Sequence, residues 1–99
     1  MQRSNETEQK YLDLIKLDPQ KTGYFYDSLM EITENPTEDM RLNSTYNVFG
    51  EWDMAVWFEA DNNDDAVHFV GEKIRSIDGV LATVTTPATL TKQYRKQRA

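Results

Sequence analysis

Few side chains of this 99-residue chain belong to the types that perform covalent chemistry. Cysteine is absent, which excludes disulfides, thiolate metal sites and thiol catalysis. The one histidine, His68, falls in a predicted helix beside its apolar stripe, where we expect it at the solvent boundary. No catalytic motif occurs anywhere in the chain. We therefore predict no catalytic residue and no cofactor, and we expect that the chain is not an enzyme.

A group of acidic residues in the second half has the composition of a cation site. It consists of Asp61, Asp64, Asp65 and Glu72. Its spacing matches no calcium-binding loop. Acidic side chains at the start of a helix are stabilised by the positive end of the helix dipole. We interpret the group in that way and predict no metal site.

The turn at residues 50–53, Gly-Glu-Trp-Asp, is the best candidate for a binding loop. Gly50 suits a tight hairpin that needs positive φ, and Asp53 is able to accept backbone amides within the turn. Binding residues also occur often on loops that a rigid scaffold positions. The sequence leaves both roles open, turn formation and ligand contact.

Aromatic residues give an alternative interpretation, an oxygenase-like pocket. The residues are Tyr11, Tyr46, Trp52, Trp57 and Phe58. Aromatic side chains also dominate cores and interfaces. Packing is therefore the interpretation that we favour.

Composition indicates one small globular domain. Hydrophobic residues make up 38% of the chain and aromatic residues 11%, enough for a core. The formal charge is −6, and four of the eleven basic residues lie in the last eight positions, so residues 1–91 combine seven positive with seventeen negative charges, or −10. Such a body repels nucleic acid. No apolar run resembles a signal sequence or a membrane span, and we expect a cytoplasmic protein that contacts no membrane.

Periodicity and turn signals divide the chain into a flexible arm (1–9), a domain (10–87) and a basic tail (88–99) that forms an arm or a short helix. Within the domain we predict strands over 10–17, 40–49, 52–60 and 80–86, and helices over 21–34 and 64–77. We expect Thr22 to cap the first helix, and Gly50-Glu51 to connect the second and third strands as a hairpin. The second helix shows an apolar stripe of Val67, Val70, Ile74 and Ile77, and Asp78-Gly79 supplies its left-handed stop.

This order of elements predicts an α+β, ferredoxin-like βαββαβ fold, with four antiparallel strands and both helices on one face. The first and third predicted strands carry apolar residues on both faces, Tyr11 and Ile15 among them, and Trp57 lies opposite an apolar series. A second copy placed sheet to sheet would bury the open face. At roughly 25 cal/mol per Å², the burial of several hundred Å² per chain contributes several kcal/mol. We therefore predict a homodimer.

Three segments resemble the ligand-sensing (RAM) domain of Lrp/AsnC regulators, whose fold is a dimeric α/β barrel. They are 48–56 (VFGEWDMAV), 73–80 (KIRSIDGV) and 83–85 (TVT). The family shows a Gly-x-Tyr-Asp turn, an Ile-x-Gly-Val helix exit and a threonine-rich last strand. The resemblance extends over about 10–87, and the order and spacing of the pieces make it more specific than any one of them.

The resemblance implies that the chain binds an amino acid or a related small effector in a cleft between dimers, and that four dimers assemble into an octamer. By position, Gly50 and Asp53 match the turn that holds the effector, and Thr83 and Thr85 match the strand that lines the cleft. Glu51 and Trp52 complete the candidate site. They also depart from the family pattern, because Trp52 replaces the usual Tyr and Glu51 adds a negative charge.

A full regulator carries an N-terminal helix-turn-helix of about fifty residues, whereas nine polar residues precede the first predicted strand. We therefore expect an effector-binding and oligomerisation module without specific DNA binding, which acts through a full-length regulator of the family. A monooxygenase-like enzyme of the dimeric α/β barrel kind is the alternative, and a purely structural oligomerisation module is a third.

Overall fold

The computed structural model of the chain describes residues 9–33, 36, 38 and 40–95. In chain order the main elements are β1 (Gln9–Leu17), α1 (Thr22–Met30), β2 (Met40–Asn47), β3 (Met54–Ala60), α2 (Asn63–Phe69) and β4 (Val80–Ala88). A 3-10 turn, η2 (Pro19–Lys21), precedes α1, and a π-helical turn, η3 (Val70–Ile74), continues α2. The predicted arm lies outside the described residues apart from Gln9, which begins β1.

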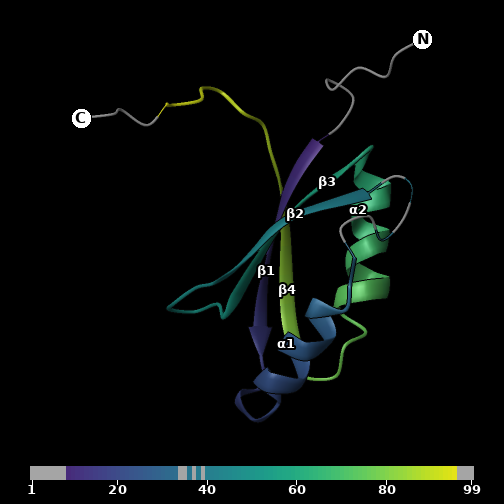
Figure 1. Cartoon of the computed structure of the whole chain (residues 1–99), viewed down its shortest axis with the longest axis vertical. Coiled ribbons are helices and arrows are strands. Elements are labelled where there is room, and N and C mark those ends of the chain that lie inside the picture. The colour runs from purple at the N-terminus through teal and green to yellow at the C-terminus, as the bar shows by residue number, and fades with distance from the viewer. Residues whose placement is uncertain (1–8, 34–35, 37, 39, 96–99) are drawn as a thin grey trace.

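The four strands form one antiparallel sheet in the order β2-β3-β1-β4. Figure 1 shows α1 and α2 on the same side of this sheet. The predicted ferredoxin-like βαββαβ fold is therefore confirmed. Because β1 and β3 are the two inner strands, their alternating side chains supply both faces of the sheet.

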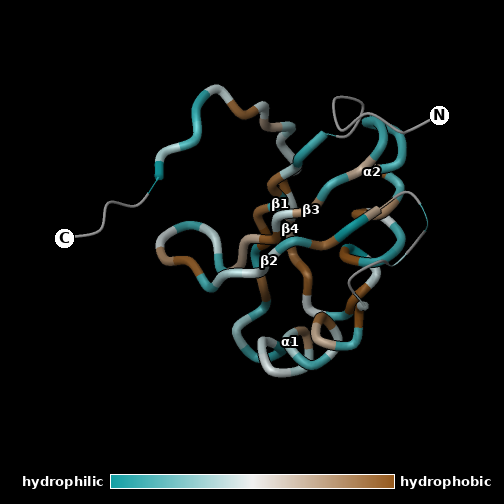
Figure 2. The backbone as a smooth tube through the Cα atoms, turned by 45° about the horizontal axis from the view of Figure 1, so that its top comes forward, coloured by the Kyte–Doolittle hydropathy of each residue, from teal (hydrophilic) through white to brown (hydrophobic). Residues whose placement is uncertain are grey.

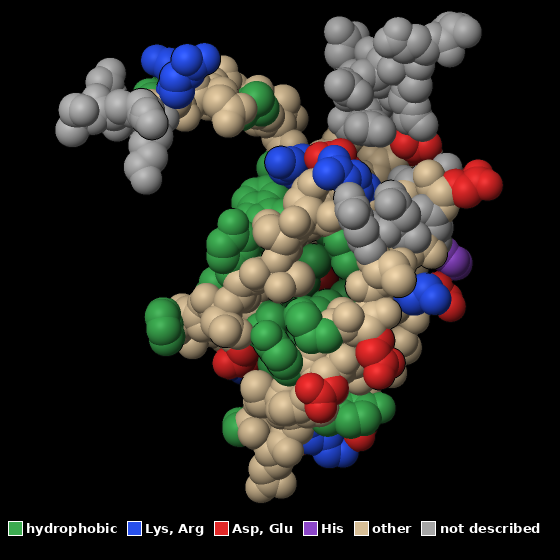
Figure 3. All heavy atoms as spheres, viewed as in Figure 1, with side chains coloured by type: hydrophobic (Ala, Val, Ile, Leu, Met, Phe, Trp, Pro, Cys, Tyr) green, Lys and Arg blue, Asp and Glu red, His purple; other side chains and the backbone are tan. Residues whose placement is uncertain are grey.

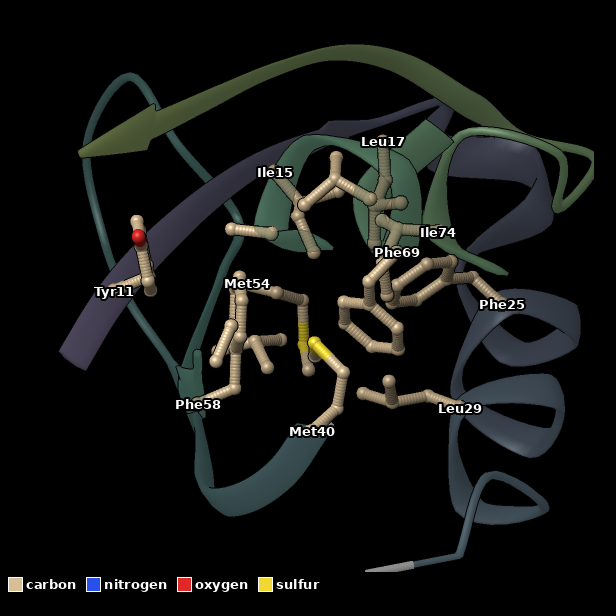
Figure 4. Packing of buried hydrophobic residues seen from close by; sticks show 14 residues of the cluster. Tyr11, Ile15, Leu17, Phe25, Leu29, Met40, Met54, Phe58, Phe69 and Ile74 are labelled. Carbon is tan, nitrogen blue, oxygen red and sulfur yellow. The ribbon is translucent and has the colours of Figure 1, made fainter. Parts of the chain in front are cut away.

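The core lies between the helices and the face of the sheet that β1 and β3 turn toward them. Phe58 of β3 is its centre, because its ring stacks on Tyr11 with centroids 5.4 Å apart and lies tilted against Phe69 of α2 at 5.1 Å. Leu29 of α1 and Met40 at the start of β2 approach the same cluster (Figure 4). All five side chains are buried.

A 3-10 turn, η2, precedes the first helix, and α1 itself begins at Thr22, one residue after its predicted start at residue 21. The Asp18 carboxylate accepts the backbone N–H of Gln20 at 3.0 Å and so caps the η2 turn that leads into α1. Thr22 is therefore not the N-cap, and its hydroxyl lies near the carbonyls of Asp18 and Pro19 at 3.4 Å. Pro19 fixes the φ of the first residue of this turn, so helical structure starts before Thr22. The helix ends at Met30, so its predicted extension through residues 31–33 is wrong, and residue 34 lies outside the described residues.

The second helix begins at an Asn62 cap, whose side chain accepts the Asp65 N–H at 2.8 Å. Its buried residues are Ala66, Phe69, Val70 and Ile74, whereas Val67 is 66% exposed. The predicted place of Val67 in the apolar stripe is thus wrong. A π-turn rotates each residue by less than an α-turn does, so η3 shifts the phase between Val67 and Ile74. No described helix is long and apolar enough to cross a membrane.

Strand β2 lies at one edge of the sheet, and its apolar residues do not all lie on one face. The register shifts between Leu42 and Ser44, which places an extra residue, Asn43, in the strand. Leu42 therefore pairs with Phe58 on the helix side, whereas Tyr46 pairs with Ala55 on the other side. Strict alternation along the strand would place Leu42 and Tyr46 on the same face, but the β-bulge reverses the alternation beyond it.

Strand β4 forms the other edge and begins directly after Gly79, whose φ of +105° is the left-handed stop predicted from Asp78-Gly79. The strand continues through Pro87 to Ala88, so the prediction that Pro87 ends it is wrong. Proline is tolerated there because an edge strand pairs on one side only. Residues 89–95 form neither helix nor strand and extend away from the domain (Figure 1), and the rest of the predicted basic tail lies outside the described residues.

The side of the sheet away from the helices carries apolar residues and is covered by neither α1 nor α2. Leu12 and Leu14 of β1, Trp57 of β3 and Val84 of β4 alternate onto this open face. Figure 2 shows hydrophobic (brown) segments along the strands, and Figure 3 shows hydrophobic side chains at the surface on the side away from the helices. The expectation that both faces of the sheet carry apolar groups is therefore confirmed, with Tyr11 and Ile15 on the helix side.

We expect Phe58→Ala to lower the free energy of unfolding by about 3 to 5 kcal/mol, because it leaves a cavity against Tyr11 and Phe69. Chemical denaturation followed by circular dichroism measures the change. Phe49→Ala is the matched control, since this phenylalanine is 98% exposed and a surface substitution changes stability by about 0.5 kcal/mol or less. Equal losses in the two variants would contradict the core described above.

Candidate functional site

The loop between β2 and β3 is longer than the two-residue connection that the sequence predicts. The strands end at Asn47 and begin again at Met54, so six residues, 48–53, form the connection. The Val48 N–H donates to the Asp53 carbonyl at 3.1 Å and closes the loop. Gly50 has φ +103° with open space around its Cα, which confirms that the turn needs glycine for its backbone conformation.

Asp53 joins this loop to the end of β1. Its carboxylate accepts the Leu17 N–H at 2.7 Å, and its own N–H donates to the Ile15 carbonyl at 2.9 Å. The Lys16 ammonium adds a third tie by donating to the Glu51 carbonyl at 3.0 Å. The carboxylate thus accepts a backbone amide of a neighbouring strand rather than one within the turn. This arrangement holds the loop in place and leaves the Glu51 carboxylate exposed.

The two threonines lie on the opposite side of β1 from this loop. Thr83 pairs with Ile15, and Thr85 pairs with Asp13, so both threonines are on the helix side of β4. Both are half-buried. The Thr85 hydroxyl lies 3.0 Å from Asp13 Oδ1, within hydrogen-bond distance. Thr83 and Thr85 therefore form a hydroxyl-bearing strip at an edge of the sheet.

Asp13 is a polar residue of this region that the sequence analysis missed. It is completely buried, and it is the one charged side chain among the buried residues that the structure describes. Oδ2 has no hydrogen-bond partner in the described part of the chain. Burial raises the pKa of the Asp13 carboxyl to about 7, although the Thr85 hydrogen bond and the Arg75 charge act in the opposite direction. A carboxylate within the otherwise apolar alternation of Tyr11, Ile15 and Leu17 is the signal that would have found it.

The predicted site residues form two separate groups in one copy of the chain. The loop residues Gly50, Glu51, Trp52 and Asp53 adjoin the end of β1 next to β3, whereas Thr83 and Thr85 belong to β4. Because β1 lies between β3 and β4, and strands are about 4.8 Å apart, roughly 10 Å of sheet separates the two groups. In one copy the candidate residues therefore form two separate groups, which we call part-sites of the candidate site, rather than one closed pocket.

The remaining candidates occupy ordinary structural positions. His68 is exposed on α2, and Asp64 and Asp65 lie in the first turn of that helix. No group of three or more potential metal ligands occurs in the described ranges. The aromatic residues do not surround one pocket, because Tyr11 and Phe58 stack in the core while Trp57 lies on the open face of the sheet.

No protein-family model and no curated protein matches the chain, whereas solved structures do. The protein FFRP-DM1 is 26% identical, with a TM-score of 0.66, over 82% of this chain and 99% of its own length. AsnC of E. coli is 16% identical, with a TM-score of 0.74, over 97% of this chain and 62% of its own. A transcriptional regulator from Neisseria meningitidis, solved as a complex with L-Met, is 15% identical, with a TM-score of 0.73, over 95% of this chain and 60% of its own.

This chain thus has the fold of AsnC and of the Neisseria meningitidis regulator, which confirms the fold that the resemblance in its sequence implies. It spans 62% and 60% of the lengths of the two regulators described above.

The buried carboxyl gives a pH dependence that can be measured. The pKa of Asp13 is about 7 in the folded chain against an ordinary value of 3.8, so folding favours the protonated form. The stability it gives is fully present below pH 3.8 and is lost as the pH rises through 7. We expect the free energy of unfolding to fall by about 3 kcal/mol between pH 4 and pH 7 through this group.

Chemical denaturation at several pH values, compared between the wild type and Asp13→Asn, isolates the contribution of Asp13 to the pH dependence of the free energy of unfolding. Asparagine has nearly the same shape and does not titrate, so the variant should be the more stable protein above pH 7 and should lack this part of the pH dependence. Identical pH profiles for the two proteins would show that Asp13 does not titrate in this range.

Proposed function

We propose that the chain is a small effector-binding and oligomerisation module of the Lrp/AsnC type, which binds an amino acid or a related metabolite. The observation that carries the proposal is that the two polar part-sites lie on the fold of a regulator solved with L-Met. We further propose that the module acts through a full-length regulator of the same type.

The chemistry of the two part-sites suits the two ends of an amino acid. Glu51 and Asp53 give the loop negative charge, which attracts an ammonium group. Thr83 and Thr85 offer hydroxyl groups, which donate to a carboxylate. Because roughly 10 Å of sheet separates the groups in one copy, we propose that the loop of one copy faces the threonines of another.

The open face of the sheet supports self-association. Leu12, Leu14 and Trp57 are only half-buried by their own chain and lie side by side on β1 and β3. A second sheet placed against them buries apolar surface from both copies, which is favourable at roughly 25 cal/mol per Å². We propose a homodimer joined through these faces, with an octamer of four dimers as the larger assembly.

Direct, specific binding to DNA is not part of the proposal. The two main helices of the described ranges are separated by strands, so no helix-turn-helix occurs there. The formal charge of −6 also opposes contact with phosphates.

Isothermal titration calorimetry with each of the twenty L-amino acids tests the effector site. We expect at least one to bind, and Thr85→Val to weaken that binding by about 10- to 150-fold, the effect of losing one hydrogen bond to a charged group. Thr89→Val is the matched control, since Thr89 is exposed and lies beyond β4. Failure of all twenty to bind the wild type would overturn the amino-acid proposal.

Sedimentation or light scattering tests the dimer. The chain has a mass of 11.5 kDa, and we expect the wild type at twice this mass or a larger even multiple. Leu14→Glu places a charge in the middle of the open face, so we expect it to shift the protein to monomer. Val67→Glu is the control, because Val67 is exposed on α2. Dissociation by both variants, or by neither, would contradict an interface on the open face.

A further inference from the structure

The contact between Asp13 and Thr85 joins a completely buried carboxyl to a half-buried hydroxyl. Thr85 Oγ1 lies 3.0 Å from Asp13 Oδ1, and no other hydrogen bond is found for this hydroxyl among the described residues. Asp13 Oδ2 lacks a partner in the same part of the chain. Asp13 is therefore a buried acid. Its one hydrogen-bond partner in the described chain is Thr85, a residue of the proposed effector site.

The direction of this hydrogen bond depends on the proton of Asp13. A hydroxyl has one hydrogen, and an ionised carboxylate has none. When Asp13 is ionised, Thr85 must donate inward to Oδ1. When Asp13 carries a proton on Oδ1, Asp13 donates to Thr85, and the Thr85 hydrogen is free to point outward.

The groups around Asp13 allow both states. Arg75, after η3, is the positive charge that favours the ionised form. Tyr11, two residues away on β1, donates its hydroxyl to Asn63 at 2.5 Å, and burial and the Asp65 charge raise its pKa, so it stays neutral. The facing residue of β3 is Val56, and the buried residues of α1 are apolar. Burial raises the pKa of Asp13 to about 7 against the attraction of Arg75.

We propose that Asp13 is a positioning residue of the effector site, whose proton turns the Thr85 hydroxyl outward to donate to the carboxylate of the bound effector. Ionised Asp13 opposes binding, because its carboxylate accepts the Thr85 hydrogen and places a negative charge behind the Thr85 hydroxyl. Binding of a carboxylate effector therefore takes up a proton from solvent in each chain whose Asp13 is ionised before binding, so the uptake is larger at pH 8 than at pH 6. This inference rests on the proposed effector site at Thr85.

The pH dependence of binding follows from the fraction of chains in the competent, protonated state. With a pKa of about 7, this fraction is about nine-tenths at pH 6 and one-tenth at pH 8. The apparent Kd should accordingly rise about tenfold between these two pH values. A neutral analogue without the carboxylate should not show the change.

The experiment is calorimetry of the full chain at pH 6 and pH 8 with the twenty L-amino acids, and with the α-amide of each one that binds. We expect a tenfold weaker apparent Kd at pH 8 for the free acid, and uptake of a proton that is visible as a dependence of the heat on the buffer. Asp13→Asn should bind equally at both pH values, because its amide always has hydrogens to donate to Thr85. His68→Gln should keep the wild-type ratio, since it removes the chain's one histidine and spares Asp13.

The outcomes separate the two proposals. Binding of an amino acid with no change between pH 6 and pH 8 and no proton uptake overturns the role of Asp13 and leaves the effector site standing. Loss of the pH effect in His68→Gln also overturns it. A pH effect that persists in Asp13→Asn does the same. Absence of binding by all twenty at both pH values overturns both proposals. If Asp13→Asn does not fold, proton uptake by the wild type still decides.

Discussion

The central position of β1 is the constraint on which the rest of the structure depends. An inner strand is covered or approached on both faces, so each of its residues belongs either to the core or to the open face. Its odd-numbered residues, Tyr11 to Leu17, meet the helices, and its even-numbered ones meet solvent in a single copy. The same strand receives the β2–β3 loop at its end and the threonines of β4 along its side. Core, open face and both part-sites are thus arranged around one nine-residue segment.

The position of Asp13 on the core side of β1 lowers the stability of the fold. A carboxyl on the core side of an inner strand loses its hydration, and one hydrogen bond from Thr85 replaces only part of it. A leucine or valine at that position would pack without such a penalty. Selection for stability alone does not account for an acid there, whereas the role that we propose for Asp13, orienting the Thr85 hydroxyl, would account for it.

The sequence was sufficient to predict the order of elements, the antiparallel sheet and the family resemblance, because periodicity and turn residues carry that information locally. Local signals did not reveal the bulge at Asn43, which depends on pairing with β3, or the π-turn after Phe69, which depends on packing against the sheet. Gly50 and Asp53 lie in the loop that the sequence indicated. Their separation from Thr83 and Thr85 depends on the strand order, which local sequence patterns do not specify. The importance of Asp13 depends on its burial, which those patterns do not specify either.

The two edges of the sheet have a consequence for uncontrolled assembly. Proline at position 87 removes one amide hydrogen from β4, and the bulge at Asn43 distorts the β2 edge. Neither edge therefore offers an uninterrupted ladder to which another strand could add, and growth of the sheet into a fibre is disfavoured. Two copies can then associate only through the open faces of their sheets. Such a contact is self-limiting, because each copy has one open face. The same features that protect the chain from aggregation thus favour a closed complex of defined size.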